Sequence, residues 1–150
     1  MRRLSRLEHI YEEHPLYFFT FCTPQRQDLL ANPQVHDSFR TFAQEAVSRD
    51  ILVGRYVLMP DHMHLFATFG EQNQISMWIK SLKNTLSKTL RTNGVAAPHW
   101  QKGFFDHLLR GQESYEAKWQ YVYENRVRKA LVTDAGAWPY QGEINPLDFD

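Results

Sequence analysis

The sequence predicts an α+β fold in which strands and helices follow one another in the order β-α-β-β-α-β, with one more helix after the last strand. Four short runs rich in aromatic and β-branched residues have the composition of strands. Between them, two longer segments repeat apolar residues three and four positions apart, which is typical of amphipathic helices. Proline, glycine and asparagine separate most of these segments and mark the turns.

The first predicted strand and helix cover residues 16–23 and 35–49. The strand is rich in aromatic residues and lies between two prolines. The helix follows Asn32-Pro33, a common start signal, and its apolar residues recur at helical spacing.

The central part of the chain predicts two more strands and a second helix. Residues 55–59 and 62–69 have the composition of strands, and the proline and aspartate at 60–61 interrupt the run between them. Residues 75–90 repeat apolar side chains at helical spacing, and the Asn-Gly pair at 93–94 ends that helix.

The last part of the chain predicts a fourth strand at residues 104–109 and a third helix at about residues 113–129. Signals for regular structure are weak in the tail after residue 138, which is expected to be irregular. Because the chain has 150 residues and neither an internal repeat nor a flexible linker, we expect one domain over residues 1–150.

This order of elements predicts a ferredoxin-like split βαβ antiparallel sheet whose two helices cover one face, with the third helix added at the C-terminal side. Alternation along residues 62–69 divides that strand between the two faces of the sheet. The more apolar set is expected to meet the helices: Met63, Leu65, Ala67 and Phe69. The other set is expected on a face that the helices leave uncovered: His62, His64, Phe66 and Thr68.

Composition excludes several classes of protein. Hydrophobic residues make up 43% of the chain and aromatic residues 14%, which is typical of a globular protein and not of a disordered one. Cys22, in an apolar run, is the only cysteine and is expected in the core; no internal disulfide can form, so a cytoplasmic location is expected. The sequence has no apolar stretch of signal-peptide or membrane-spanning length, and we expect no membrane partner.

Charge is distributed unevenly along the chain, although the formal net charge is zero. Residues 76–110 contain six lysine and arginine side chains against a single acidic residue, Asp106. Such a segment can bind nucleic acid even though the net charge of the whole chain is zero. An ordinary solvated helix face is the alternative. Five cations are candidate DNA contacts: Lys80, Lys83, Arg91, Lys102 and Arg110.

The most informative motif is His62-Met63-His64. Two imidazoles one residue apart on a strand project from the same face, where both can bind one metal ion. The alternative is a pair of structural histidines that hydrogen-bond their neighbours. A zinc site would need further ligands, and neither Cys22 nor the other histidines show a matching spacing. If the third protein ligand were an amide oxygen, the site would instead suit Mg²⁺ or Mn²⁺ and leave positions open for phosphate oxygens and water.

A second pair, Tyr121 and Asn125, lies in the predicted third helix. The two residues differ by about 40° around the helix axis and therefore share a face. Tyr123 is about 200° away from Tyr121 and cannot readily join the same site. Tyr115 and Trp119 follow another stripe, which is expected in the core. Without the histidine pair, a packing tyrosine whose hydroxyl bonds a neighbour would be the favoured interpretation of Tyr121.

These motifs together resemble those of the single-tyrosine HUH transposases, and most closely the REP-associated tyrosine transposases of bacteria. The resemblance is carried by residues 56–66, by residues 100–107 and by residues 121–132, and it extends over roughly residues 16–138. It implies that His62 and His64 are metal ligands. It also implies that Tyr121 is the nucleophile and Asn125 the third protein ligand.

Two positions depart from the pattern of that family, and one of them is Ala130, where glycine is common. Asn125 is followed by Arg126, whereas the family usually has proline there. Proline would end the helix, so arginine predicts a helix that continues past Asn125.

The resemblance implies metal-dependent cleavage and rejoining of single-stranded DNA next to a hairpin, through a 5′-phosphotyrosine intermediate. The implied cofactor is Mg²⁺ or Mn²⁺, and the implied partners are single-stranded DNA and DNA hairpins with REP-like palindromes. Relatives include dimers that exchange the tyrosine helix, so a homodimer is one expectation and a site within one chain is the other. Two alternatives stay open at this point: a non-catalytic nucleic-acid-binding module that uses the same sheet, and a metalloenzyme with another substrate.

Overall fold

The computed structural model describes residues 16–71, 74–109, 115–128 and 134–147, without the side chains of residues 125–128 and 135. Its strands are β1 (Leu16–Cys22), β2 (Ile51–Leu58), β3 (His62–Phe69), β4 (Phe105–Leu108) and β5 (Gln141–Glu143). Its α-helices are α2 (Pro33–Glu45), α3 (Ile75–Thr92) and α4 (Tyr115–Arg128). Three short 3-10 helices follow β1, α2 and α4: η1 (Pro24–Arg26), η2 (Ala46–Arg49) and η4 (Ala135–Ala137).

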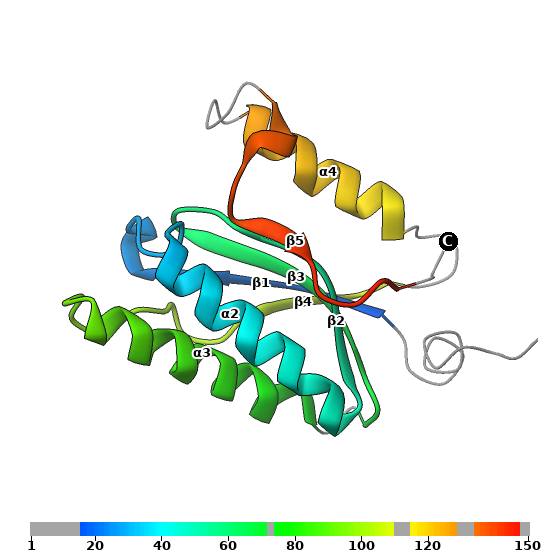
Figure 1. Ribbon diagram of the computed structural model, residues 1–150, viewed down its shortest axis with the longest axis horizontal. Helices are drawn as coiled ribbons and strands as arrows, with labels where there is room; N and C mark the ends of the chain where they lie inside the picture. Colours follow the sequence, from blue (N-terminus) through cyan, green and yellow to red (C-terminus); the bar gives the residue numbers. More distant parts are fainter. Residues whose placement is uncertain (1–15, 72–73, 110–114, 129–133, 148–150) are drawn as a thin grey trace, which may run out of the picture.

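The strands form one sheet in the order β4-β1-β3-β2-β5, and every neighbouring pair is antiparallel (Figure 1). The first four strands have the order and direction of a ferredoxin-like split βαβ sheet, which confirms the predicted fold. β5 adds a short edge strand beside β2, within the tail where the sequence signals are weak.

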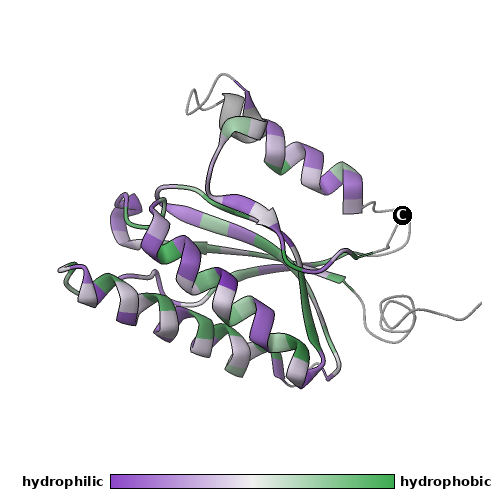
Figure 2. Ribbon diagram, viewed as in Figure 1, coloured by the Kyte–Doolittle hydropathy of each residue, from purple (hydrophilic) through white to green (hydrophobic). Residues whose placement is uncertain are grey.

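One face of the sheet is covered by α2 and α3 (Figure 1). The helices bury Phe39 and Leu82 against the sheet, and a side-chain oxygen of Asn32 accepts a hydrogen bond from Val35 N, which caps α2. In Figure 2 much of β1 and β2 is hydrophobic, whereas hydrophobic and hydrophilic residues recur along α2 and α3, as expected for helices with one apolar face. The predicted inward set of β3 belongs to this core: Met63, Leu65, Ala67 and Phe69.

The other face is not left uncovered, so that part of the prediction is wrong. α4 lies across it, on the side opposite α2 and α3 (Figure 1). Tyr115 and Trp119 of α4 are buried in a second, smaller core with Phe66, and the Tyr115 and Phe66 ring centroids are 4.7 Å apart. An apolar stripe on α4 needs a partner surface, and the aromatic side chains on this face of the sheet provide one.

Two boundaries differ by more than two residues from the sequence prediction. β2 begins at Ile51 rather than at residue 55, and its pairing with β3 shifts between Val53 and Tyr56, which marks a β-bulge near Gly54. The first helix changes from α-helix to a 3-10 turn after Glu45. Among the described residues, no helix is long and apolar enough to cross a membrane.

Candidate functional site

His62 and His64 lie at the beginning of β3, the central strand, on the face that α4 covers in part. Their ring centroids are 4.9 Å apart and the ring planes are inclined by 77°. His62 is only 5% exposed, whereas His64 is half-buried. The period-two geometry of the strand therefore brings the two imidazoles together.

The ring of His62 is held by a carboxylate that comes from the preceding bend. Asp61 Oδ1 lies 2.7 Å from His62 Nδ1, and the second oxygen, Oδ2, accepts a hydrogen bond from Arg26 Nε at 2.8 Å. Burial raises the pKa of Asp61, but hydrogen bonds from Arg26 and His62 outweigh it and lower that pKa to about 2. Asp61 is therefore a carboxylate at neutral pH, and it accepts a hydrogen bond from His62 Nδ1.

The ring of His64 is held from the neighbouring strand. Thr20 is its partner in the β1–β3 register, and Thr20 Oγ1 lies 2.8 Å from His64 Nδ1. The ring of Phe18 stacks against His64 with centroids 5.1 Å apart and planes inclined by 19°. Both histidines thus have a hydrogen-bond partner at Nδ1, which is the arrangement in which the other ring nitrogen, Nε2, can act as a metal ligand.

The donor set of these residues fits a divalent ion that retains open positions. Among the described residues, no group of three or more His, Cys, Asp or Glu side chains could hold a metal. Two imidazoles with an amide oxygen fit the preferences of Mg²⁺ or Mn²⁺ better than those of a tetrahedral zinc site. The side chain of Asn125, the predicted source of that amide, lies outside the described residues, although its backbone continues α4.

α4 runs from the middle of the sheet toward the end that carries the histidines. Its first residue, Tyr115, contacts Phe66 and Arg55, which lie within β3 and β2. Trp138, which follows the helix in the chain, donates from Nε1 to the carbonyl of Leu58, the last residue of β2. Leu58 pairs with Met63, between the two histidines. The second half of α4 therefore extends toward the histidine end of the sheet.

Tyr121 lies at the middle of α4, and the residue is 65% exposed. One turn earlier, Lys118 Nζ lies 5.1 Å from the centre of the Phe18 ring, which stacks on His64. Tyr123 instead packs on Trp119, with ring centroids 6.0 Å apart. The helix continues through Arg128, past Asn125, as predicted from the arginine at position 126.

Three of the predicted DNA contacts lie together. A groove of about 340 Å³ between α3 and the following loop is lined by Lys80, Lys83 and Lys102, together with Trp100 and Phe104. Lys83 Nζ also donates to the Gly103 carbonyl, and burial lowers the pKa of this lysine.

The other two predicted contacts are not in this groove. Arg91 is exposed near the end of α3, eight residues beyond Lys83 and therefore about 12 Å farther along the helix. Arg110 lies outside the described residues.

The groove reaches the histidine end of the sheet. Gln101 donates from its backbone N to Cys22 O at 2.8 Å and from Nε2 to Thr23 O at 3.1 Å. Cys22 is the β1 partner of His62 and is half-buried rather than in the core, where it was expected. The loop that forms one wall of the groove thus adjoins the strand end next to His62.

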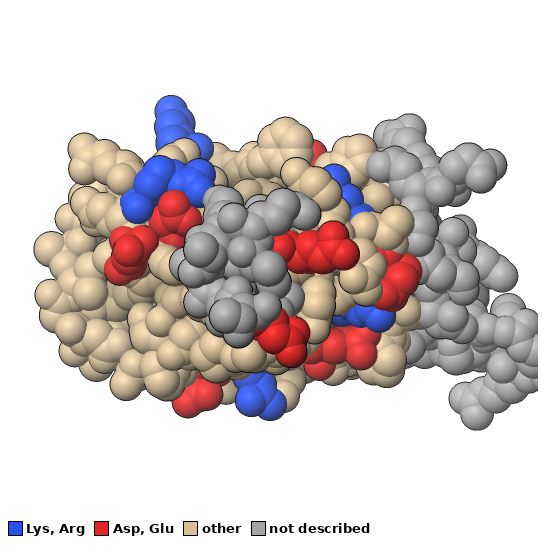
Figure 3. All heavy atoms as spheres, turned by 90° about the horizontal axis from the view of Figure 1, so that it is seen from above, with Lys and Arg blue, Asp and Glu red and all other residues tan. Residues whose placement is uncertain are grey.

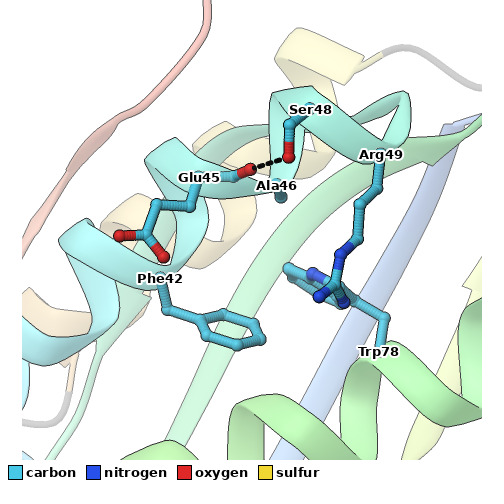
Figure 4. A pocket seen from close by; sticks show the side chains of 6 residues that line it. All are labelled: Phe42, Glu45, Ala46, Ser48, Arg49 and Trp78. Carbon is cyan, nitrogen blue, oxygen red and sulfur yellow. Dashed lines mark hydrogen bonds between the residues drawn. The ribbon is translucent and has the colours of Figure 1, made fainter.

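Two other features of the surface are visible in the figures. On the face seen from above, acidic and basic side chains are interspersed among the described residues (Figure 3). A smaller depression of about 130 Å³ lies between α2, η2 and α3; Arg49 and Trp78 line it, and Ser48 bonds the Glu45 carbonyl (Figure 4). It lies on the α2–α3 side of the sheet and contains none of the predicted site residues.

The sequence interpretation missed Asp61, Arg26 and Thr20. The sequence indicates only that Asp61 lies in a turn or bulge between two strands, although an acidic residue directly before a candidate metal ligand is a local signal. Arg26 and Thr20 are 36 and 44 residues away from the histidines that they contact. Nothing local in the sequence indicates those contacts, because the Thr20 contact depends on the β1–β3 register and the Arg26 contact on the left-handed residues after β1.

Comparison with known proteins identifies similar chains. The profile of a family described as "Transposase IS200 like" matches residues 13–125. A candidate REP-associated tyrosine transposase of Haemophilus influenzae is 23% identical over 168 residues, covering 97% of this chain and 93% of that protein. An uncharacterized protein of the same organism is 21% identical, covering 84% of this chain and 88% of its own length.

Two solved structures have a similar fold. One is a REP-associated tyrosine transposase bound to a REP hairpin, with a TM-score of 0.64 and 19% identity over 99% of this chain and 96% of that chain. The other is a candidate transposase from Deinococcus radiodurans R1, with a TM-score of 0.53 and 19% identity over 84% of this chain and 98% of that chain. Both contain the sheet-and-helix arrangement described above.

Proposed function

This chain belongs to the family of IS200-like transposases, and we propose that it cleaves and rejoins single-stranded DNA next to a hairpin through a covalent tyrosine intermediate. The observation that carries the proposal is the histidine pair, whose Nδ1 atoms both have hydrogen-bond partners. A structural role alone would not require two neighbouring imidazoles that are both hydrogen-bonded through Nδ1.

His62 and His64 would hold a divalent ion through Nε2, with the amide of Asn125 as a further ligand. When bound, Mg²⁺ or Mn²⁺ would polarise the scissile phosphate and neutralise charge on its oxygens. The chain supplies the orientation of both imidazoles through Asp61 and Thr20.

Tyr121 is the proposed nucleophile. Phenols are weak nucleophiles at neutral pH, because their ordinary pKa is about 10, so positioning on α4 has to supply part of the rate. The Tyr121 oxygen would attack the phosphorus, a 5′-phosphotyrosine would form, and the 3′-oxygen of the preceding nucleotide would leave as a hydroxyl. The phenolic proton would pass to water or hydroxide, and attack by another 3′-hydroxyl would reverse the reaction.

The proposed substrate is a DNA hairpin with an adjacent single strand. A similar fold has been solved with a REP hairpin bound, which supports this substrate class. The groove with Lys80, Lys83 and Lys102 combines positive charge with the aromatic rings of Trp100 and Phe104, as single-strand binding sites do. Because this groove adjoins the end of β1 beside His62, one strand could contact both.

The test is covalent capture of an oligonucleotide hairpin with a single-stranded extension, in Mn²⁺, detected by a mobility shift on a denaturing gel. We expect an adduct with the native chain and none with Tyr121→Phe or after addition of EDTA. Tyr123→Phe is the matched control, because that residue lies on another face of the same helix, and it should form the adduct. An adduct with Tyr121→Phe would refute the assignment, and hairpin binding without any adduct would favour a non-catalytic binding module.

A further inference from the structure

The segment after β1 is bonded closely to the bend that precedes His62. Thr23 donates to Asp61 O from its backbone N at 3.0 Å and from its hydroxyl at 3.1 Å. Leu29 N and Leu30 N both donate to Pro60 O, at 2.9 and 3.0 Å. These bonds fix the position of residues 23–30 relative to Asp61.

Within this segment, Gln25 and Arg26 have left-handed backbone angles, with φ of 54° and 56°. Such angles are uncommon for residues other than glycine, and they persist only where surrounding contacts hold them. They place the Arg26 guanidinium beside the site, where Nε donates to Asp61 Oδ2 at 2.8 Å and Nη1 lies 3.6 Å from Cys22 Sγ.

The donor and acceptor properties of its neighbours decide whether His62 Nδ1 carries a proton. Both Asp61 Oδ1, at 2.7 Å, and Arg26 Nη2, at 3.3 Å, lie near this nitrogen. A carboxylate has no proton to donate, and a guanidinium has no lone pair to accept one. The shorter contact therefore requires a proton on Nδ1 that points to Asp61, so Arg26 acts on the ring through Asp61.

We propose that Arg26 is a positioning residue: it holds the Asp61 carboxylate so that His62 keeps its proton on Nδ1 and presents the lone pair of Nε2 to the metal. This inference rests on the proposed function for the presence of the metal, but the tautomer can be measured without it. Arginine suits the task because its planar guanidinium can bond one carboxylate oxygen while it lies against the imidazole that bonds the other.

The first experiment measures the His62 tautomer in the metal-free protein by long-range ¹H–¹⁵N NMR, with the His62 signals assigned from their loss in His62→Gln. We expect the Nδ1–H tautomer in the native chain and a mixture of tautomers in Arg26→Gln. Arg49→Gln is the control, because Arg49 is an exposed arginine just before β2, at the opposite end of the sheet.

The second experiment measures the affinity for Mn²⁺ without DNA, by isothermal titration calorimetry. Asp61→Asn and Arg26→Gln should each weaken binding by about 10-fold or more, as removal of an outer-shell partner does in other metal sites. The double variant should bind no more weakly than Asp61→Asn alone, because Arg26 acts through Asp61. Arg26→Lys keeps the charge but loses the planar guanidinium with its several N–H donors. Its affinity for Mn²⁺ should therefore lie between those of the native chain and Arg26→Gln.

The proposal is overturned if folded Arg26→Gln keeps the native tautomer and the native Mn²⁺ affinity, or if the two substitutions are additive. If the native chain itself fails to bind Mn²⁺, the metal part of the proposed function fails, while the tautomer comparison still decides the role of Arg26. Two-dimensional NMR spectra of each variant show whether it is folded, and Arg26→Lys provides the comparison if Arg26→Gln does not fold.

Discussion

Single side chains determine how the two histidines are oriented, and their partners differ in strength. His62 bonds a carboxylate, whereas His64 bonds a hydroxyl on the neighbouring strand. Hydrogen bonds to a charged group contribute about twice as much as neutral ones. The orientation of His64 should therefore be the more easily disturbed of the two.

The first prediction concerns Thr20→Val, which removes the partner of His64 Nδ1 and keeps the shape of the side chain. Loss of one neutral hydrogen bond costs about 1 kcal/mol, which corresponds to roughly fivefold weaker binding of Mn²⁺ by calorimetry. Thr68→Val is the control, because the buried Thr68 hydroxyl has no partner among the described residues. Equal Mn²⁺ affinities of Thr20→Val and the native chain would show that Thr20 does not orient the ring.

At this scale, the sequence predicts what depends on local periodicity and little else. The shared face of His62 and His64 follows from the two-residue repeat of a strand, and the separation of Tyr123 from Tyr121 follows from the helical repeat. The contacts of Thr20 and Arg26 come from strand register and from two left-handed residues. Neither feature leaves a pattern in the surrounding sequence.

At the scale of elements, the placement of α4 depends on its first turn. Tyr115 Oη accepts a hydrogen bond from Arg55 N at 2.8 Å, and the Arg55 guanidinium lies over the Tyr115 ring and bonds Glu116. Gly54 leaves the space for this contact, because an added Cβ would collide with the Tyr115 hydroxyl and lie 2.6 Å from Leu147 Cδ1.

The second prediction is that Gly54→Ala displaces the start of α4. Overpacking of this kind should lower the free energy of unfolding by about 1–3 kcal/mol in urea denaturation. Adduct formation by Tyr121 should fall, whereas Mn²⁺ affinity should change little, since β3 is not displaced. Adding Tyr115→Phe removes the colliding hydroxyl and should restore part of the adduct yield, and purely additive losses would contradict this account.

The third prediction concerns the groove beside α3. Lys80→Gln and Lys102→Gln together should weaken binding of the hairpin oligonucleotide and reduce the slope of log K against log salt by about 2, roughly one per phosphate contact. Arg91→Gln should leave both quantities unchanged, because Arg91 lies outside the groove. A larger effect of Arg91→Gln than of the lysine pair would place the DNA elsewhere on the protein.

Most elements were predictable because each has its own periodic pattern, as β3 and α3 have. β5 was not, since three residues are too few to show alternation and its pairing depends on the exposed edge of β2. The covering of the second face was missed for a related reason. The apolar stripe of α4 was recognised, but the sequence does not state which surface it meets.

At the scale of the whole molecule, the sheet separates two cores, and each contains a buried tyrosine. Burial raises the pKa of Tyr56 to about 12, and burial also raises the pKa of Tyr115. Tyr56 belongs to the core under α2 and α3, and its hydroxyl lies 2.7 Å from His36 Nε2, whereas Tyr115 belongs to the core under α4.

The fourth prediction follows from the sign of these shifts. A tyrosine whose folded pKa exceeds its unfolded value of about 10 leaves stability unchanged below pH 10, and stability is then lost as the pH rises from 10 toward 12, by up to about 1.4 kcal/mol per unit and per tyrosine. Denaturant unfolding at pH 8 and pH 11.5 should show this loss. Tyr56→Phe should reduce the difference between the two pH values, and an unchanged difference would show that Tyr56 is not responsible.

The fifth prediction is that one chain provides the whole site. α4 follows β4, which pairs with β1, and it precedes Trp138 and β5, which are both bonded to β2. Because the chain is anchored to its own sheet on both sides of α4, exchange of this helix with a second copy would have to break one of these connections or rebuild both linkers. A mixture of His62→Ala and Tyr121→Phe chains should therefore form no covalent DNA adduct. In an exchanged dimer, the intact histidine of one copy would meet the intact tyrosine of the other, so adduct formation by the mixture, when neither variant alone forms one, would show that the site is shared.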